Sequence, residues 1–271
     1  MLTSLQGRIV VFAGPSMPSQ RRPADPRLVW RGPAMAGDVL WLSGRGPAAV
    51  VLVDGVFDEV PSVRHKELLV LMGEGVRVMG GASMGALRAA ELQAFGMIGI
   101  GRVFAAYARG SLTGDDEVAL AHAPEQLDWR PLSEALVNVR ATLQRAMRRR
   151  VIDAATARAL FLAAQGLFFR ERTWPLVLDS LKRGGLSLAT FERWLPAGRV
   201  DVKAEDALAC VQAALDLGPV ADGGRTAPPA TLFTAALAKQ IGWRPASAGQ
   251  GRAAAEAPAH LRAGGSGLPP A

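Results

Sequence analysis

The sequence predicts an α/β protein: a parallel sheet with flanking helices in three layers, followed by a helical C-terminal half and a disordered tail. Two observations predict this fold. In the first 130 residues, continuous apolar runs typical of parallel strands buried on both faces alternate with helical segments. From Pro131 to Leu217 the pattern is helical, and the chain beyond Leu217 is rich in Gly, Ala and Pro.

Three strands are predicted in order, and each leads to a polar residue. The first strand, residues 7–14, is followed by Ser16. The second, residues 48–54, ends at Asp54, and the third, residues 76–79, leads to Ser83. A Pro- and Arg-rich connector separates the first two strands. Because ligands collect beyond the carboxyl ends of parallel strands, these polar residues are expected at one shared edge.

The helices follow from their caps and their apolar spacing. They are predicted from Ser62, as N-cap, to Gly73, from Ala86 to Gln93, and from Gly99 onward, with a strand carrying His122 at residues 118–123. Further helices are predicted at Ser133–Arg150, Asp153–Phe169, Trp174–Arg183, near Thr190 and at Lys203–Leu217. In the last of these, the apolar stripe is Ala204, Ala207, Leu208, Val211 and Leu215. The predicted domains are residues 7–130, residues 131–217 packed on them, and the tail 218–271.

Composition limits the classes of function. No apolar run approaches the roughly 20 residues of a membrane span, and no signal-peptide pattern is seen, so a cytoplasmic protein without membrane contact is expected. The net charge of +7 comes from arginine without interleaved aromatic residues, which favours biased composition over nucleic-acid binding. The densest cluster, Arg145 with residues 148–150, leaves an acidic protein partner open.

Metal and nucleotide sites are not expected. The three histidines lie far apart, and Cys210 is the single cysteine, in an apolar helical setting. Neither a P-loop nor a dinucleotide fingerprint is present, because Gly99-x-Gly101 lacks a third glycine and follows no clear strand. We therefore expect no cofactor.

Ser83 is the candidate nucleophile. It occupies a Gly-x-Ser-x-Gly frame between the third strand and a helix, where a hydroxyl is exposed beside free backbone N–H groups. The alternative is a glycine-rich turn that binds an anion or only packs a helix on the sheet. The expected oxyanion and binding groups are Gly14, Ser16, Gly81, Met84 and Arg88, with the Met84 N–H as the main donor.

Two histidines are candidate bases for Ser83. His65 has Asp54 or Asp58 near it in the sequence, and His122 has Asp115 or Asp116. Each has a structural alternative: His65 as a surface or capping residue, and His122 as a core histidine. The choice between them stays open.

Several longer motifs resemble the TfuA family. They are VFAGPSMP from Val11, VDGVF-x3-PSVRHKE from Val53, GASMGALRAAEL from Gly81, FGMIGIGRVF from Phe95, GDDEVALAHAP from Gly114, RPLSEALVNVR from Arg130 and VDVKAEDA from Val200. The resemblance covers roughly Arg8 to Leu217.

The resemblance implies a partnership with a YcaO-type ATP-dependent enzyme that converts an amide of a ribosomally made peptide to a thioamide. It further implies sulfide delivery from the thiocarboxylate of a ubiquitin-like sulfur carrier, with the precursor peptide as a further partner. A serine, a base and an oxyanion hole suit this acyl transfer. The competing hypothesis is a non-catalytic protein that docks on the YcaO enzyme and activates it.

Overall fold

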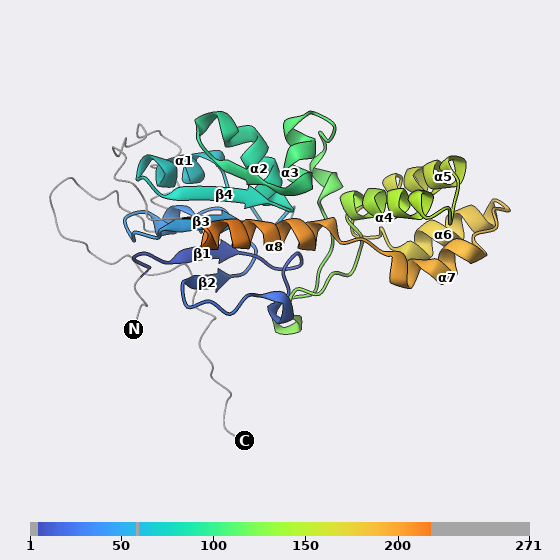
Figure 1. The fold of residues 1–271 in the computed structure, drawn as a ribbon, viewed down its shortest axis with the longest axis horizontal. Coiled ribbons are helices and arrows are strands. Elements are labelled where there is room, and N and C mark those ends of the chain that lie inside the picture. The colour runs from blue at the N-terminus through green and yellow to red at the C-terminus, as the bar shows by residue number, and fades with distance from the viewer. Residues whose placement is uncertain (1–4, 58–59, 218–271) are drawn as a thin grey trace, which may run out of the picture.

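A five-stranded parallel sheet forms the centre of the molecule (Figure 1). The computed structural model describes residues 5–57 and 60–217. The strands are β1 (Ile9–Phe12), β2 (Leu28–Arg31), β3 (Ala49–Leu52), β4 (Arg77–Gly81) and β5 (Ile98–Ile100). Their order is β2-β1-β3-β4-β5, and every neighbouring pair is parallel. The predicted fold class is confirmed.

Alternate residues of the central strands face two different cores. On one face, Val10, Val50 and Val78 pack with helices α1 (His65–Gly73) and α2 (Met84–Leu92). On the other, Val11 and Val51 pack with α8 (Val202–Leu215). The period of two along each strand thus gives the sheet one helical layer on each side.

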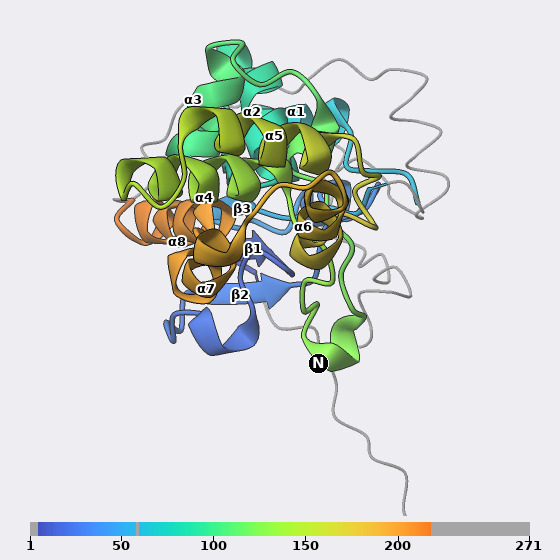
Figure 2. The ribbon, with the colours of Figure 1, turned by 90° about the vertical axis from the view of Figure 1, so that its right-hand side faces the viewer.

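The helical half lies beyond the tips of the strand arrows in Figure 1, and Figure 2 views it from the front. Its helices are α4 (Leu136–Arg148), α5 (Ala154–Gln165), α6 (Trp174–Arg183) and α7 (Ala189–Gly198). They enclose a third core that includes Leu143, Leu160, Trp174 and Phe191. Helix α3 (Gly101–Ala108) packs against both α2 and α8. None of the described helices has the length and apolar character that a bilayer span requires.

The Pro- and Arg-rich connector contains an unpredicted strand, β2, and a second unpredicted strand, β5, precedes α3. Both are edge strands of the sheet with mostly half-buried residues, so neither shows a continuous apolar run. The Gly99-x-Gly101 segment overlaps the end of β5, since Gly99 lies within the strand and Gly101 directly follows it, so a strand is present where the sequence showed none.

Residues 118–123 are not the predicted strand. Short 3-10 turns at Asp115–Glu117 and Glu125–Leu127 flank this segment, and only His122 forms an isolated bridge, to Pro131. Its backbone bonds are mixed: the Ala121 N–H donates to Ser133 Oγ at 2.7 Å, whereas the Ala123 N–H donates to the Arg130 carbonyl at 2.9 Å. Helix α1 also starts later than predicted, with Arg64 as N-cap, because the Glu67 carboxylate accepts the Arg64 N–H.

Helix α8 departs from its predicted apolar stripe. Leu208 is 48% exposed, whereas Lys203 and Asp206 are buried together with Ala207 and Cys210. The face of α8 that is buried is therefore rotated about the helix axis relative to the predicted apolar stripe. This buried face carries two charged residues. The predicted domain boundaries remain a prediction, and the predicted tail lies outside the described residues.

Candidate functional site

Three loops meet at the carboxyl edge of the sheet. Strand β3 pairs with β1 on one side and with β4 on the other, so the segments that follow these strands are neighbours. They carry Ser16 after β1, Asp54 after β3 and Ser83 after β4, and all three residues are buried. This edge faces the helical half (Figure 1), as expected for the site of an open parallel sheet.

The turn before Ser83 is strained. Ala82 has φ +65°, a left-handed conformation that is uncommon for a residue with a side chain. The Ser83 N–H donates to the Gly81 carbonyl at 2.7 Å, which closes a three-residue turn. Such strain persists only where the surroundings enforce it, and it clusters at functional sites.

The close approach of α2 to β3 enforces this turn. A Cβ on Gly85 would lie 1.8 Å from the Leu52 carbonyl oxygen, and one on Gly55 would lie 2.2 Å from Met84 Sδ. The Gly85 N–H also donates to the Val53 carbonyl at 3.2 Å. Glycine at these positions therefore brings the start of α2 beside the loop that carries Asp54.

Ser83 is the N-cap residue of α2, but its hydroxyl makes no capping hydrogen bond. The residue is 2% exposed, and its Oγ is not among the fully enclosed side-chain atoms that lack a partner. Within the described residues the Met84 N–H donates to no acceptor, which leaves it beside Ser83 as an anion-binding group at a helix N-terminus.

Asp54 organises the loop after β1. Its Oδ2 accepts the N–H groups of Gly14 at 2.8 Å and Ser16 at 2.9 Å, and its Oδ1 accepts the Ser16 hydroxyl at 2.7 Å. The backbone donors of Gly14 and Ser16, candidates for an oxyanion hole, are therefore directed to Asp54. Asp54 is not hydrogen-bonded to either histidine.

His65 lies near the other end of α2. Its Nε2 is 2.7 Å from Glu91 Oε2, and Arg88 Nη1 bonds the same carboxylate oxygen at 2.7 Å. Glu91 follows Ser83 by eight residues, about 12 Å along a helix. The structure therefore joins His65 with Arg88 and Glu91 rather than with Asp54 or Ser83, and Asp58 lies outside the described residues.

His122 lies in the loop between α3 and α4. Its Nδ1 is 2.8 Å from the Ala123 carbonyl oxygen. Because a carbonyl only accepts, Nδ1 is the donor of this bond, and in the neutral ring Nε2 is then an acceptor. In the described chain the exposed Asp115 makes no bond to this ring, and Asp116 pairs with Arg172 instead. Trp129 of the same loop packs beside Gly14, so the loop reaches the carboxyl edge.

Lys203 is the charged residue at this edge that the sequence interpretation missed. It is 2% exposed, and its Nζ donates to the Val118 carbonyl at 2.6 Å. Burial lowers the pKa of its ammonium, while the negative charges of Asp54 and Asp201 raise that pKa. One sequence signal could have indicated that Lys203 is buried: it lies four residues before Ala207 and seven before Cys210, and therefore on the helix face that packs against the sheet.

Comparison with known proteins finds a family match for part of the chain. Residues 54–173 match the family described as TfuA-like protein. This segment of the chain is a TfuA-like domain. Curated proteins give no match. The TfuA match includes Asp54, His65, Ser83 and His122, whereas Lys203 lies outside the matched range. TfuA proteins are associated with YcaO enzymes.

Within the described part of this TfuA-like chain, no three His, Cys, Asp or Glu side chains are placed to hold a metal ion. Cys210 is buried against Gly81, and burial raises the pKa of its thiol. A thiol that stays protonated is a poor nucleophile. Cys210 is therefore a weaker candidate nucleophile than Ser83.

Proposed function

We propose that this TfuA-like protein is an accessory protein of YcaO-dependent peptide thioamidation, and that it releases sulfide from a thiocarboxylated ubiquitin-like carrier at Ser83. The observation that carries the proposal is the Ser83 hydroxyl, which makes no capping hydrogen bond and lies beside the unused Met84 N–H. The TfuA-like domain supports the link to a YcaO enzyme.

The proposed reaction is acyl transfer in two steps. Ser83 Oγ bonds to the carbonyl carbon of the thiocarboxylate, R–C(=O)S⁻, and the C–S bond breaks. The proton lost by the hydroxyl leaves with sulfur as HS⁻, and the carrier stays bound as an ester. Water then breaks the ester, which gives the carrier carboxylate and restores the hydroxyl. The Met84 N–H stabilises the oxyanion of both tetrahedral intermediates.

This reaction needs a base for the Ser83 proton. The sequence predicts His65 or His122 in this role. Of the two, His122 has a free acceptor nitrogen, whereas the His65 ring is paired with Glu91.

Sulfide release from a purified thiocarboxylated carrier tests the proposal. The wild-type protein is expected to release sulfide, and Ser83→Ala to lose roughly 1000-fold in rate while its circular dichroism is unchanged. Ser180→Ala, which removes an exposed hydroxyl in the helical half, is the matched control and keeps the wild-type rate. Equal rates for Ser83→Ala and wild type would reject the serine-centred reaction.

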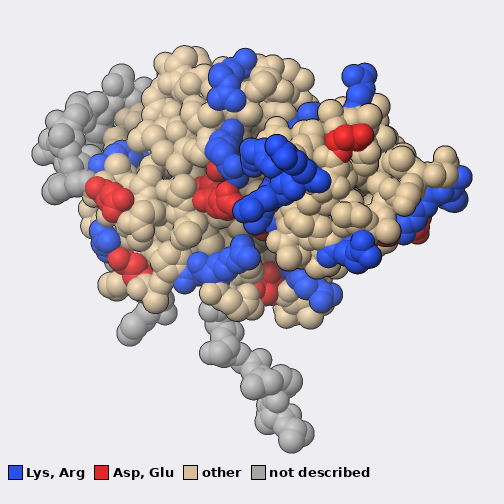
Figure 3. Space-filling view, turned by 45° about the vertical axis from the view of Figure 1, so that its right-hand side comes forward, with Lys and Arg blue, Asp and Glu red and all other residues tan. Residues whose placement is uncertain are grey.

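The second candidate function is non-catalytic docking on the YcaO enzyme, and the arginine cluster of Arg145 with residues 148–150 favours it. Residues 148–150 of this cluster are exposed at the end of α4. Within the described residues, none of the four arginine side chains forms an ion pair. Figure 3 shows how basic side chains gather on this side of the molecule. A surface of this kind suits an acidic partner.

Charge reversal separates the two functions. For docking, Arg148→Glu with Arg149→Glu is expected to weaken binding to a purified YcaO enzyme at least 10-fold, as measured by calorimetry. The matched control is Arg158→Glu with Arg183→Glu on the exposed side of other helices. Binding that persists in the first variant would remove this candidate.

A further inference from the structure

We propose that Arg22 forms a second, anion-binding subsite at the carboxyl edge of the sheet, and that it binds the carboxylate of an acidic side chain in the peptide that reaches Ser83. The inference rests on the proposed function, in which the tail of a carrier protein reaches Ser83, and it adds the class of peptide that the site prefers. It is carried by the fixed position of the Arg22 guanidinium and by the N–H groups that this guanidinium leaves free.

The Arg22 guanidinium lies at the end of β1. Its Nη2 donates to the Ala13 carbonyl at 3.3 Å, and its Nε donates to the Met17 carbonyl at 3.1 Å. Ala13 directly follows β1, and Ala13 and Met17 flank the loop whose N–H groups bond Asp54. The guanidinium therefore lies at the carboxyl edge of the sheet, beside the loop that Asp54 organises.

Two tryptophans flank the guanidinium and restrict its movement. The Cζ atom of Arg22 lies 5.0 Å from the ring centroid of Trp30 in β2 and 5.7 Å from that of Trp129. The Trp129 ring is itself closely packed, because a Cβ on Gly32 would lie 2.8 Å from its Cζ2. Asp128 and Trp129 also have left-handed φ values of +55° and +48°, which only the surrounding fold enforces. Arg22 thus loses little further freedom when it binds an anion.

The guanidinium keeps one complete side for a ligand. It has five N–H groups, and the two carbonyls use one of Nε and one of Nη2. Within the described residues Arg22 forms no ion pair, so both N–H groups of Nη1 and one of Nη2 are left. This pair of nitrogens can bond both oxygens of one carboxylate.

The acidic groups around Arg22 act on its charge from a distance. They are Asp128, Asp54 and Glu125, which raise the pKa of Arg22, whereas burial lowers it. Asp128 is bonded to Ser19, and Asp54 to the loop after β1. Because an arginine stays charged in either case, a half-buried cation is held here without a carboxylate in contact with it.

The distance along the sheet edge indicates where the acidic residue of the peptide lies. Strand β3 lies between β1 and β4, so the ends of β1 and β4 are about 10 Å apart at a strand spacing of about 4.8 Å. An extended peptide covers about 3.3 Å per residue. A peptide that runs from Arg22 to Ser83 therefore places its acidic side chain about three residues before the reacting carbonyl.

The first test compares peptides that bind the wild-type protein. The probes are acetylated pentaglycine peptides in which the glycine two, three or four positions before the last is replaced by glutamate or by glutamine. Tryptophan fluorescence measures binding, because Trp30 and Trp129 flank Arg22. The glutamate peptide with three positions is expected to bind at least 10-fold more tightly than its glutamine counterpart. Equal dissociation constants would overturn the inference, and this comparison does not depend on the folding of a variant.

Protein variants then assign the preference to Arg22. In Arg22→Met, the glutamate and glutamine peptides are expected to bind within 2-fold of each other, whereas Arg22→Lys keeps the charge without the planar fork and retains part of the preference. The matched control is Arg21→Met, at an exposed neighbour whose contact with Asp201 is 3.9 Å, and it keeps the full preference. A full preference in Arg22→Met, or its loss in Arg21→Met, would contradict the inference.

Peptides with an amidated C-terminus separate the two carboxylates of each probe. The glutamate preference is expected to persist in them. Binding that depends on Arg22 only when the C-terminus is a free acid would assign Arg22 to the terminal carboxylate and reject an acidic side chain.

The outcome for the subsite can be told apart from that for the proposed reaction. If glutamate binding depends on Arg22 but no thiocarboxylated carrier releases sulfide, the subsite stands and the proposed reaction fails. If the thiocarboxylates of the glutamate and glutamine peptides release sulfide at equal rates, the reaction stands and the subsite is rejected.

Discussion

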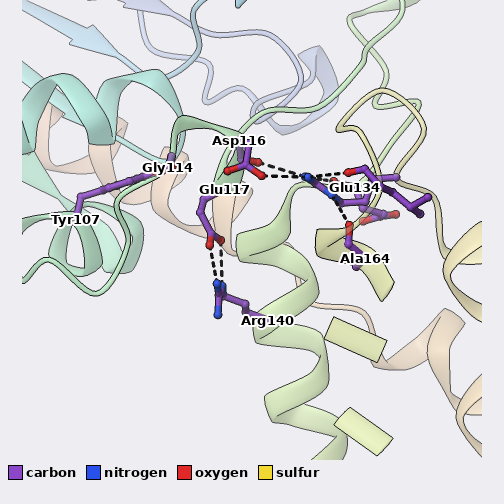
Figure 4. A network of polar contacts seen from close by, with 9 residues as sticks. Tyr107, Gly114, Asp116, Glu117, Glu134, Arg140 and Ala164 are labelled. Carbon is purple, nitrogen blue, oxygen red and sulfur yellow. Dashed lines mark hydrogen bonds and ion pairs between the residues drawn. The ribbon is translucent and has the colours of Figure 1, made fainter. Parts of the chain in front are cut away.

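Buried charges are held differently in the two halves of the molecule. In the helical half, Arg172 is 1% exposed, and its guanidinium bonds the carbonyls of four residues and the Asp116 carboxylate. Arg140 pairs with Glu117 through two bonds of 3.0 and 2.6 Å (Figure 4). In the sheet half, Lys203, Asp54 and Glu67 are equally buried, but none of them forms an ion pair within the described residues.

This difference separates charges that are fixed by ion pairs from charges that are held by hydrogen bonds to neutral groups alone. A guanidinium with all its donors bonded is fixed in place and stays charged, because any change of state would leave several acceptors buried without a partner. Lys203 and Glu67 are bonded only by backbone groups, so either can change its charge without breaking an ion pair. The half with unpaired buried charges is also the half that carries Ser83.

The largest expected effect is at Arg172. Arg172→Met leaves four carbonyls and the Asp116 carboxylate without their donor, so we expect a loss of about 3–5 kcal/mol in the free energy of unfolding. Urea unfolding measures it. Arg172→Lys keeps the charge without the planar fork and should fall between Met and wild type. A loss below about 1 kcal/mol in Arg172→Met would show that this network contributes little.

The sheet half depends instead on close backbone approach, most clearly at Gly85. Gly85→Ala is expected to cost about 3 kcal/mol, because its Cβ meets the Leu52 carbonyl oxygen and α2 must shift. The shift also displaces Ser83, so sulfide release from the thiocarboxylated carrier should slow. The control is Gly166→Ala, where the added Cβ would make an ordinary contact of 3.4 Å, with a change within about 0.5 kcal/mol. Equal stabilities for the two variants would be evidence against close packing at Gly85.

Regular features of the fold can be predicted from the sequence where one local signal dominates. The strands β1, β3 and β4 are buried on both faces and read as apolar runs. The sequence predicts both ends of α6, because Thr173 caps its start and Gly184 follows its end. The edge strands β2 and β5 are not predicted, because most of their residues are half-buried and neither strand shows a continuous apolar run.

The candidate site is less predictable, because its contacts join distant parts of the chain. Ser83 is visible in its glycine frame. The partners of Asp54 are backbone N–H groups about 40 residues away, which no side-chain pattern records. The burial of Lys203 depends on α8 returning to the sheet after the whole helical half. Spacing in the sequence paired His65 with Asp54 or Asp58, whereas its partner in the fold is Glu91.

The pH dependence of stability at Glu67 tests whether a buried charge of the sheet half can change its protonation state. Burial is the main cause that raises its pKa from 4.5 to about 7, despite three backbone N–H donors. A raised carboxyl pKa means that the protonated form is favoured by folding, so this stabilisation is complete below pH 4.5 and lost as the pH rises through 7. Wild-type stability should therefore fall by roughly 2–3 kcal/mol between pH 5 and 8 relative to Glu67→Gln. Urea midpoints at both pH values measure this difference, and the exposed Glu171→Gln should follow wild type. Parallel pH curves for wild type and Glu67→Gln would contradict the assignment.

The smallest expected effects compare two adjacent residues of α8, one exposed and one buried. Glu205 pairs with Arg102 at 2.5 Å, but both side chains are about 60% exposed, so Glu205→Gln should change the free energy of unfolding by less than about 0.5 kcal/mol. Asp206 is buried and accepts the N–H groups of Arg102 and Val103 at the start of α3. Asp206→Ala removes this cap and should cost about 1–2 kcal/mol by urea unfolding. An equal loss of stability in Glu205→Gln and Asp206→Ala would mean that exposed ion pairs stabilise the sheet half as much as its buried cap does. The contrast between the sheet half and the helical half would then weaken.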